Sequence, residues 1–162
     1  MAGDGGAVCR YVASKEGEEM MSYTAAIQTH ASTETAYQAI TQEMSDWWTT
    51  MSGQFLKIGD QAQTDFGGQS YWRFEAQTLN RPDLIELRCC DAFHIHEGLP
   101  EDIKEEWLDT VLRFEIKEIE SGSDITFTHR GLTSDLHCFD VCKACWDHYF
   151  LGSLKVYLDK KK

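Results

Sequence analysis

Apolar and polar residues alternate through much of residues 53–132, a pattern typical of β-strands that face a core on one side. One predicted strand has Trp72, Phe74 and Ala76 on one face, with polar or half-polar residues between them. The alternation recurs over residues 85–90, 108–117 and 125–128, and Gly- or Pro-containing turns separate the runs. These half-polar strands predict an antiparallel sheet with one face exposed to water.

Helical spacing lies on both sides of this β-rich region. After an alternating strand over residues 23–28, Ser32 begins a predicted helix, because a hydroxyl followed by an early acid typically caps a helix. Trp47 and Trp48 fall on a second short helix or turn. A last helix is predicted from Ser134 to about Lys160, with one apolar stripe: Phe139, Cys142, Trp146, Tyr149, Phe150 and Leu154. This order of elements predicts an α+β domain with the helices on one face of the sheet.

The length of 162 residues fits one domain, which we place at residues 21–160. Residues 1–20 are rich in glycine and charge and carry no periodic apolar pattern. We expect them to form a disordered N-terminal tail, because they have too little apolar surface to offset the entropy of ordering.

The net charge is −12, from 27 acidic and 15 basic residues. This charge disfavours binding to nucleic acid or to an anionic membrane surface. No apolar run reaches the roughly 18 residues of a membrane-spanning helix, and the N-terminus does not resemble a signal peptide. The six cysteines are interpreted as reduced thiols packed as small apolar groups, which predicts a cytoplasmic protein.

Three stretches of sequence resemble the START-like (SRPBCC) superfamily, which includes the birch-pollen allergen and polyketide cyclases. Residues 31–48, ASTETAYQAITQEMSDWW, resemble its first-helix region. Residues 125–132 and 138–158, ITFTHRGL and CFDVCKACWDHYFLGSLKVYL, look like the last strand and terminal helix of one subgroup, named after the activator of the heat-shock-chaperone ATPase. Trp146 and the run Gly152-Ser153-Leu154 carry most of the likeness. Ser32, Ala36, Tyr37 and Cys145 depart from the usual pattern of these relatives.

The resemblance implies a helix-grip fold, in which a curved antiparallel sheet of about six or seven strands wraps around a long C-terminal helix. A ligand cavity often lies between the sheet and that helix in such proteins. In the two-domain chaperone activators this fold is only the C-terminal part, and residues 1–20 are too few to form their chaperone-binding domain.

The prediction for function is therefore a monomeric or homodimeric binding protein for a small apolar, lipid-like or aromatic molecule. We expect His129 to orient the ligand and aromatic residues to form the walls: Trp47, Trp72, Phe74, Phe114, Phe127, Trp146 and Phe150. The competing interpretation is a closed aromatic core with His129 as a bonded core histidine. Two other functions stay open: an enzyme of the cyclase or hydrolase type that uses His129 with Asp91 or Asp109, and an interaction module that regulates a chaperone.

No cofactor and no metal site are predicted. His94 and His96 share one strand face, but no third ligand is spaced convincingly near them. Cys138, Cys142, Cys145 and His148 extend over about 15 Å of one helix, so a single zinc ion cannot reach all four. The sequence also contains none of the Gly-rich nucleotide-binding motifs and no nucleophile elbow of the G-x-S-x-G type.

Overall fold

A computed structural model of the chain describes residues 8–9, 22–66 and 69–161. The strands form one antiparallel sheet in the spatial order β1-β2-β7-β6-β5-β4-β3. They are β1 (Val8–Cys9), β2 (Tyr23–Thr29), β3 (Gln61–Asp65), β4 (Tyr71–Asn80), β5 (Leu84–Phe93), β6 (Val111–Ile119) and β7 (Gly122–Arg130). Over these described residues the sheet has six longer strands and a two-residue edge strand, in agreement with the six or seven predicted.

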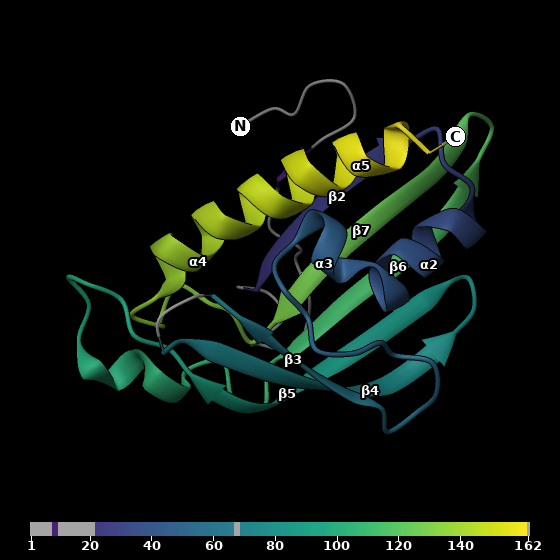
Figure 1. Cartoon of the computed structure of the whole chain (residues 1–162). Coiled ribbons are helices and arrows are strands. Elements are labelled where there is room, and N and C mark those ends of the chain that lie inside the picture. The colour runs from purple at the N-terminus through teal and green to yellow at the C-terminus, as the bar shows by residue number, and fades with distance from the viewer. Residues whose placement is uncertain (1–7, 10–21, 67–68, 162) are drawn as a thin grey trace.

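The last helix lies across the concave face of the sheet (Figure 1). It runs continuously for 21 residues through α4 (Phe139–Trp146), the π-helical stretch η2 (Asp147–Leu154) and α5 (Lys155–Asp159). Two short helices, α2 (Thr33–Gln42) and α3 (Met44–Trp47), lie between β2 and β3 in the chain, and a 3₁₀ helix, η1 (Glu101–Glu105), lies between β5 and β6. The predicted α+β helix-grip architecture is therefore confirmed.

The curvature of the sheet has a local cause. The pairing of β4 with β5 shifts register twice, between Arg73 and Phe74 and between Ala76 and Thr78. Such bulges bend the bulged strand and increase its twist, which lets a long hairpin curl around a helix. The β6–β7 hairpin closes through Gly122, whose φ of 148° and closeness to the Thr29 carbonyl oxygen leave no room for a Cβ atom.

Polar contacts fix the helix on the sheet along its length. The Tyr23 hydroxyl donates to the Asp147 carboxylate at 2.7 Å, and the Thr29 hydroxyl donates to Asp159 at 2.6 Å. Both donors lie on β2. Because one contact lies near the middle of the helix and the other at its C-terminal end, they set the angle at which the helix crosses the strands.

Two boundaries differ from those predicted. The strand expected over residues 108–117 begins only at Val111, because Asp109 adopts a left-handed backbone with φ of 70° and Thr110 closes a turn onto Trp107. The last helix begins at Phe139 and not at Ser134, because residues 134–138 form turns.

Part of the predicted tail is described. Val8 and Cys9 pair with Ala26 and Ala25 as an edge strand. Residues 1–7 and 10–20 lie outside the described residues, so the expectation of disorder there stays a prediction. Among the described helices, none combines the length and the apolar character that crossing a bilayer requires.

Candidate functional site

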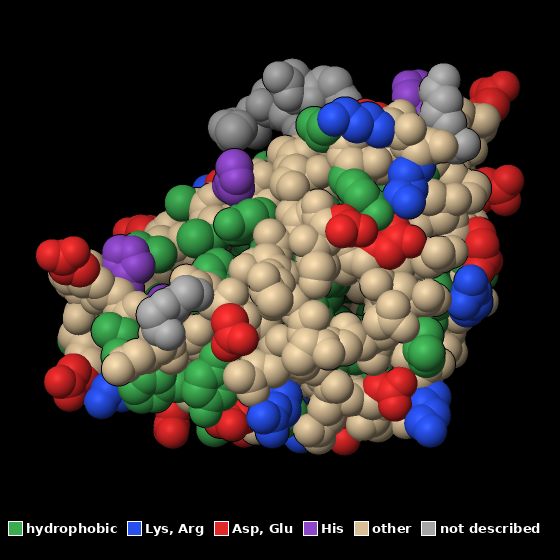
Figure 2. All heavy atoms as spheres, viewed as in Figure 1, with side chains coloured by type: hydrophobic (Ala, Val, Ile, Leu, Met, Phe, Trp, Pro, Cys, Tyr) green, Lys and Arg blue, Asp and Glu red, His purple; other side chains and the backbone are tan. Residues whose placement is uncertain are grey.

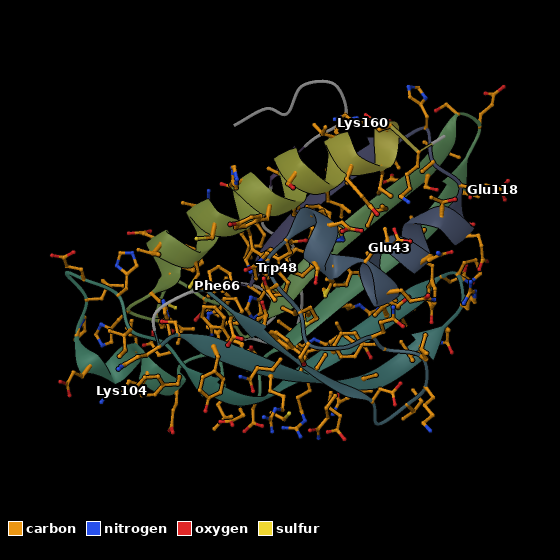
Figure 3. The ribbon with its side chains drawn as sticks, viewed as in Figure 1. Glu43, Trp48, Phe66, Lys104, Glu118 and Lys160 are labelled. Atoms are coloured by element: carbon orange, nitrogen blue, oxygen red, sulfur yellow. The ribbon has the colours of Figure 1, made fainter. Side chains whose placement is uncertain are left out.

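A cavity of about 590 Å³ lies at the α4 end of the molecule, between the terminal helix, the end of α3 and the adjoining ends of β3, β4 and β5. Figure 3 labels Trp48 and Phe66, which lie between the helix and the sheet in this region. In Figure 2, hydrophobic side chains gather around α4 and below it. The residues that line the cavity are Trp48, Phe66, Gln69, Ser70, Trp72, His94, Ile95, His96, Trp107, Val141, Cys142, Cys145 and Trp146.

Large aromatic rings form a continuous part of the cavity wall. Trp72 and Trp107 stack with ring centroids 4.3 Å apart, and Trp107 lies nearly parallel to Trp146 at 6.1 Å. Phe66 meets Trp72 edge to face at 4.7 Å, and Trp48 lies 4.9 Å from Trp146. Rings that pack against one another in this way hold a fixed apolar surface around the space.

The rim of the cavity carries a few polar groups. The Ser70 hydroxyl donates to the Ile95 carbonyl oxygen at 3.1 Å, and the Ile95 amide donates to the Ser70 oxygen at 3.0 Å. This reciprocal pair ties the segment before β4 to the segment after β5. Two buried nitrogens of cavity-lining residues, Trp72 Nε1 and His94 Nδ1, have no hydrogen-bond partner among the described residues.

Only two of the residues predicted to contact a ligand line this cavity, Trp72 and Trp146. Trp47 is buried beside it and donates its indole N–H to the Ala39 carbonyl oxygen at 3.0 Å, while its neighbour Trp48 lines the wall. The remaining predicted wall residues are fully buried. Phe74 lies behind the cavity wall, against Trp48 and Trp107. The others form a closed ring cluster further along the helix: Phe114, Phe127 and Phe150. Phe127 lies 4.6 Å from Phe114 and 5.3 Å from Phe150, so the space predicted between them is filled.

His129 is also away from the cavity lining and is fully buried. Its Nδ1 accepts the indole N–H of Trp146 at 3.0 Å, and its Nε2 lies 2.8 Å from the Thr110 hydroxyl. Burial lowers the pKa of the imidazole to about 3. Both ring nitrogens thus have hydrogen-bond partners within the protein. His129 is a bonded core histidine, the alternative that the sequence left open.

The acid–base pairs considered for an enzyme do not form. Asp109 is exposed and accepts from Arg88 at 2.8 Å, and Asp91 accepts from the Tyr71 hydroxyl at 3.3 Å. Neither carboxylate is bonded to His129, whose two ring nitrogens contact Thr110 and Trp146. The structure therefore does not assemble the general base that a cyclase or hydrolase reaction would need from these residues.

Trp107 is the main cavity residue that the sequence analysis missed. It directly follows residues 97–106, which include five acidic residues, yet Ile103 and Trp107 are both buried. Their separation of four residues, one helical turn, was the available signal for a short buried face. Phe66 and Val141 were also missed, because neither belongs to a clear apolar stripe.

The structure joins two groups of residues that the sequence analysis treated separately. The candidate ligand atoms of His94, Cys138 and Cys142 all lie within 4.8 Å of one another. Cys138 and Cys142 are one turn apart on the helix, and His94 comes from the segment that follows β5. His94 meets the two cysteines only because of the way the helix crosses the sheet, and no local spacing in the sequence encodes that crossing.

No protein-family model matches the chain, and no curated protein matches it. Several solved structures do share its fold. The Aha1 dimer from Colwellia psychrerythraea, determined in solution, is 25% identical, with a TM-score of 0.69 over 88% of this chain and 99% of that one. Protein MLL2253 from Mesorhizobium loti is 14% identical, with a TM-score of 0.70 over 87% of this chain and 98% of that one.

A third similar structure is DynU16, a putative protein of the dynemicin biosynthetic locus. It is 16% identical, with a TM-score of 0.62, and the match covers 86% of this chain and 47% of DynU16. Together these likenesses confirm the START-like helix-grip fold, of the kind found in Aha1, that the sequence resemblance predicted.

Proposed function

We propose that this START-like helix-grip protein binds one small, mainly apolar molecule in the cavity beside α4. The observation that carries the proposal is the cavity itself, since about 590 Å³ lies within the range of roughly 300–1,000 Å³ usual for small-molecule sites. An apolar wall with a few polar groups at its rim is the usual composition of such sites.

The lining indicates the chemistry of the ligand. None of the described residues that line the cavity is Asp, Glu, Lys or Arg, so a carboxylate or phosphate would find no opposite charge there. The faces of Trp72, Trp107 and Trp146 suit flat rings, which gain from stacking beyond the area they bury. We therefore expect a neutral aromatic or lipid-like ligand, with apolar burial of about 25 cal/mol per Å² as the main source of affinity.

The residues predicted from sequence take different parts in this proposal. Trp72 and Trp146 contact the ligand. Phe74, Phe114, Phe127 and Phe150 support the wall from behind, and Trp47 holds Trp48 in place through its stacked ring at 6.4 Å. His129 positions Trp146 through the hydrogen bond to its indole and does not reach the ligand.

A role in regulating a chaperone is the second candidate, favoured by the likeness to the Aha1 dimer over nearly the whole of that chain. It requires an apolar docking surface outside the cavity. Leu56 and Ile58, exposed at 63% and 59% on the loop before β3, are candidates for such a surface. The same likeness supports a homodimer, and the free thiols suit a reducing cytoplasm.

Native mass spectrometry of freshly purified protein tests the binding proposal. We expect an added mass that organic extraction removes and identifies. Val141→Trp fills the cavity from α4 and should abolish the added mass. Ala144→Trp places the same side chain on an exposed position of the same helix and should leave it unchanged. Spectra without added mass, together with no thermal shift from neutral aromatic or lipid probes, would contradict the proposal.

A further inference from the structure

Three side chains with metal-binding atoms meet between the start of α4 and the end of β5. His94, Cys138 and Cys142 are buried, with exposed fractions of 6%, 0% and 3%, and their candidate ligand atoms all lie within 4.8 Å of one another. Cys138 immediately precedes α4 and Cys142 lies one turn later, so both sulfur atoms face the same side of the helix.

The chemistry of this cluster is incomplete without a further partner. His94 Nδ1 is buried and has no hydrogen-bond partner among the described residues, which is unusual because buried polar atoms are nearly always paired. The Cys138 and Cys142 thiols lie beside this ring, so the three side chains together offer one nitrogen and two sulfur ligand atoms.

We propose that His94, Cys138 and Cys142 bind one zinc ion. Two thiolates and one neutral imidazole are ligands that zinc prefers, and the two negative charges balance the ion, which suits a buried site. On one tetrahedral zinc, such ligand atoms lie about 3.6–3.8 Å apart. The present separations need only small side-chain adjustments to reach these values.

Residues 104–107 form hydrogen bonds with all three proposed ligand residues. The Lys104 carbonyl oxygen accepts the His94 amide at 2.9 Å, and the Glu106 carboxylate accepts the Cys138 amide at 3.0 Å. The Trp107 indole N–H donates to Cys142 Sγ at 3.3 Å. Hydrogen bonds of this kind orient metal ligands and stabilise a bound thiolate. The acidic segment around η1 thus has a structural reason to be ordered.

The site has an open side. His94 and Cys142 also line the cavity, so a zinc ion bound there would meet the cavity at its fourth coordination position. Three protein ligands with one open position are typical of zinc sites that bind water or a substrate atom. Only this last point rests on the proposed ligand-binding function. Zinc binding by the three side chains is independent of it.

Zinc titration of the metal-free protein, kept reduced with a non-thiol reductant, tests the site. In competition with a chromophoric chelator we expect one zinc per chain. Substitution with cobalt(II) should give sulfur-to-cobalt charge transfer and the intense ligand-field absorption of a tetrahedral ion. These spectra report on the unaltered protein, so they do not depend on whether a variant folds.

Variants then identify the ligands. Cys138→Ser, Cys142→Ser and His94→Gln should each weaken zinc binding more than about 100-fold, beyond the 10- to 100-fold typical of residues that only orient a ligand. Cys145→Ser is the matched control, because Cys145 lies on the same helix and lines the cavity but is outside the cluster. It should bind zinc like the unaltered protein. No stoichiometric zinc, an octahedral cobalt spectrum, or equal affinity in His94→Gln would overturn the proposal, whatever the cavity binds.

Discussion

The indole nitrogen of Trp146 on α4 donates a 3.0 Å hydrogen bond to Nδ1 of His129 on β7, inside the core. This contact determines the directions of the bonds that follow. If Nδ1 accepts, Nε2 carries the proton and donates to the Thr110 hydroxyl at 2.8 Å. That hydroxyl in turn donates to the Trp107 carbonyl oxygen at 2.6 Å. The chain of bonds connects two tryptophans of the cavity wall and holds the imidazole neutral.

The neutral state of His129 predicts how stability depends on pH. Its pKa is about 3 in the folded protein and about 6.5 in the unfolded chain, so only the unfolded state gains a proton between these values. The stabilising contribution is complete above pH 6.5 and is lost as the pH falls toward 3. In urea unfolding experiments below pH 6, this group should make the free energy of unfolding decrease as the pH falls. The decrease should approach about 1.4 kcal/mol per pH unit.

The control for this prediction is His129→Gln, which keeps a polar side chain but cannot titrate. The variant should be less stable at neutral pH. Between pH 6 and 5 its free energy of unfolding should depend less steeply on pH, by the uptake of about one proton. An unchanged slope in the variant would show that other groups cause the acid sensitivity. The pKa values of three carboxyls are lowered in the fold, those of Glu43, Glu86 and Asp159. Their stabilising contributions are lost at lower pH than that of His129, as the carboxylates become protonated.

The closed ring cluster predicts a large loss of stability on truncation. Phe127 is fully buried between Phe114, Phe150 and Trp146. Phe127→Ala should reduce the free energy of unfolding by about 3–5 kcal/mol, because it removes apolar burial and leaves a cavity. Val156→Ala, at an exposed position of α5, should change it by less than about 0.5 kcal/mol. Similar values for the two variants in urea unfolding would contradict a packed cluster.

The start of α2 predicts a smaller, local effect. The Ser32 hydroxyl accepts the Thr35 amide at 3.1 Å and thereby caps the helix. Ser32→Ala should cost about 1 kcal/mol, while Ser32→Gly should cost only a few tenths, because glycine is tolerated at this position. Thermal unfolding of the two variants measures the difference, and equal stability of Ser32→Ala and the unaltered protein would show that the cap contributes nothing.

Gly59 and Gly122 both have a positive φ, but replacing them with alanine should reduce stability to different extents. Gly59 and Gly122 have φ of 94° and 148°, but only at Gly122 would a Cβ atom overlap the backbone, 2.0 Å from the Thr29 carbonyl oxygen. Gly59→Ala should cost about 1–2 kcal/mol from the left-handed conformation alone. Gly122→Ala should cost more, because β2 and the β6–β7 hairpin must separate. A reversed order in chemical denaturation would exclude the clash as the cause.

The elements that depend on local pattern could be predicted from the sequence. The alternation around Trp72 and Phe74 gave the strand and its buried face, and Ser32 marked the start of a helix. The periods of strands and helices are encoded over a few neighbouring residues, so they can be recognised without knowing which element packs against them. The start of β6 was misplaced because Asp109 takes a left-handed turn that the alternating pattern of its neighbours does not signal.

The location of the cavity could not be predicted in the same way. Phe114 and Phe127 do face the helix as predicted, but their rings meet and close that part of the interior. The opening lies at the α4 end, where Trp107 arrives from a loop. Which part of an inner face stays open depends on helix placement and ring packing, both set by contacts between residues far apart in the sequence.

The five tryptophans allow the most direct test of the proposed binding cavity. Trp48, Trp72, Trp107 and Trp146 line it, while Trp47 is buried outside its lining. Indole N–H resonances in a ¹H–¹⁵N NMR titration with 2-naphthol, a neutral aromatic probe, should shift saturably for those four and least for Trp47. Shifts confined to Trp47, or no saturable shift of any indole, would contradict a ligand-binding cavity at the α4 end.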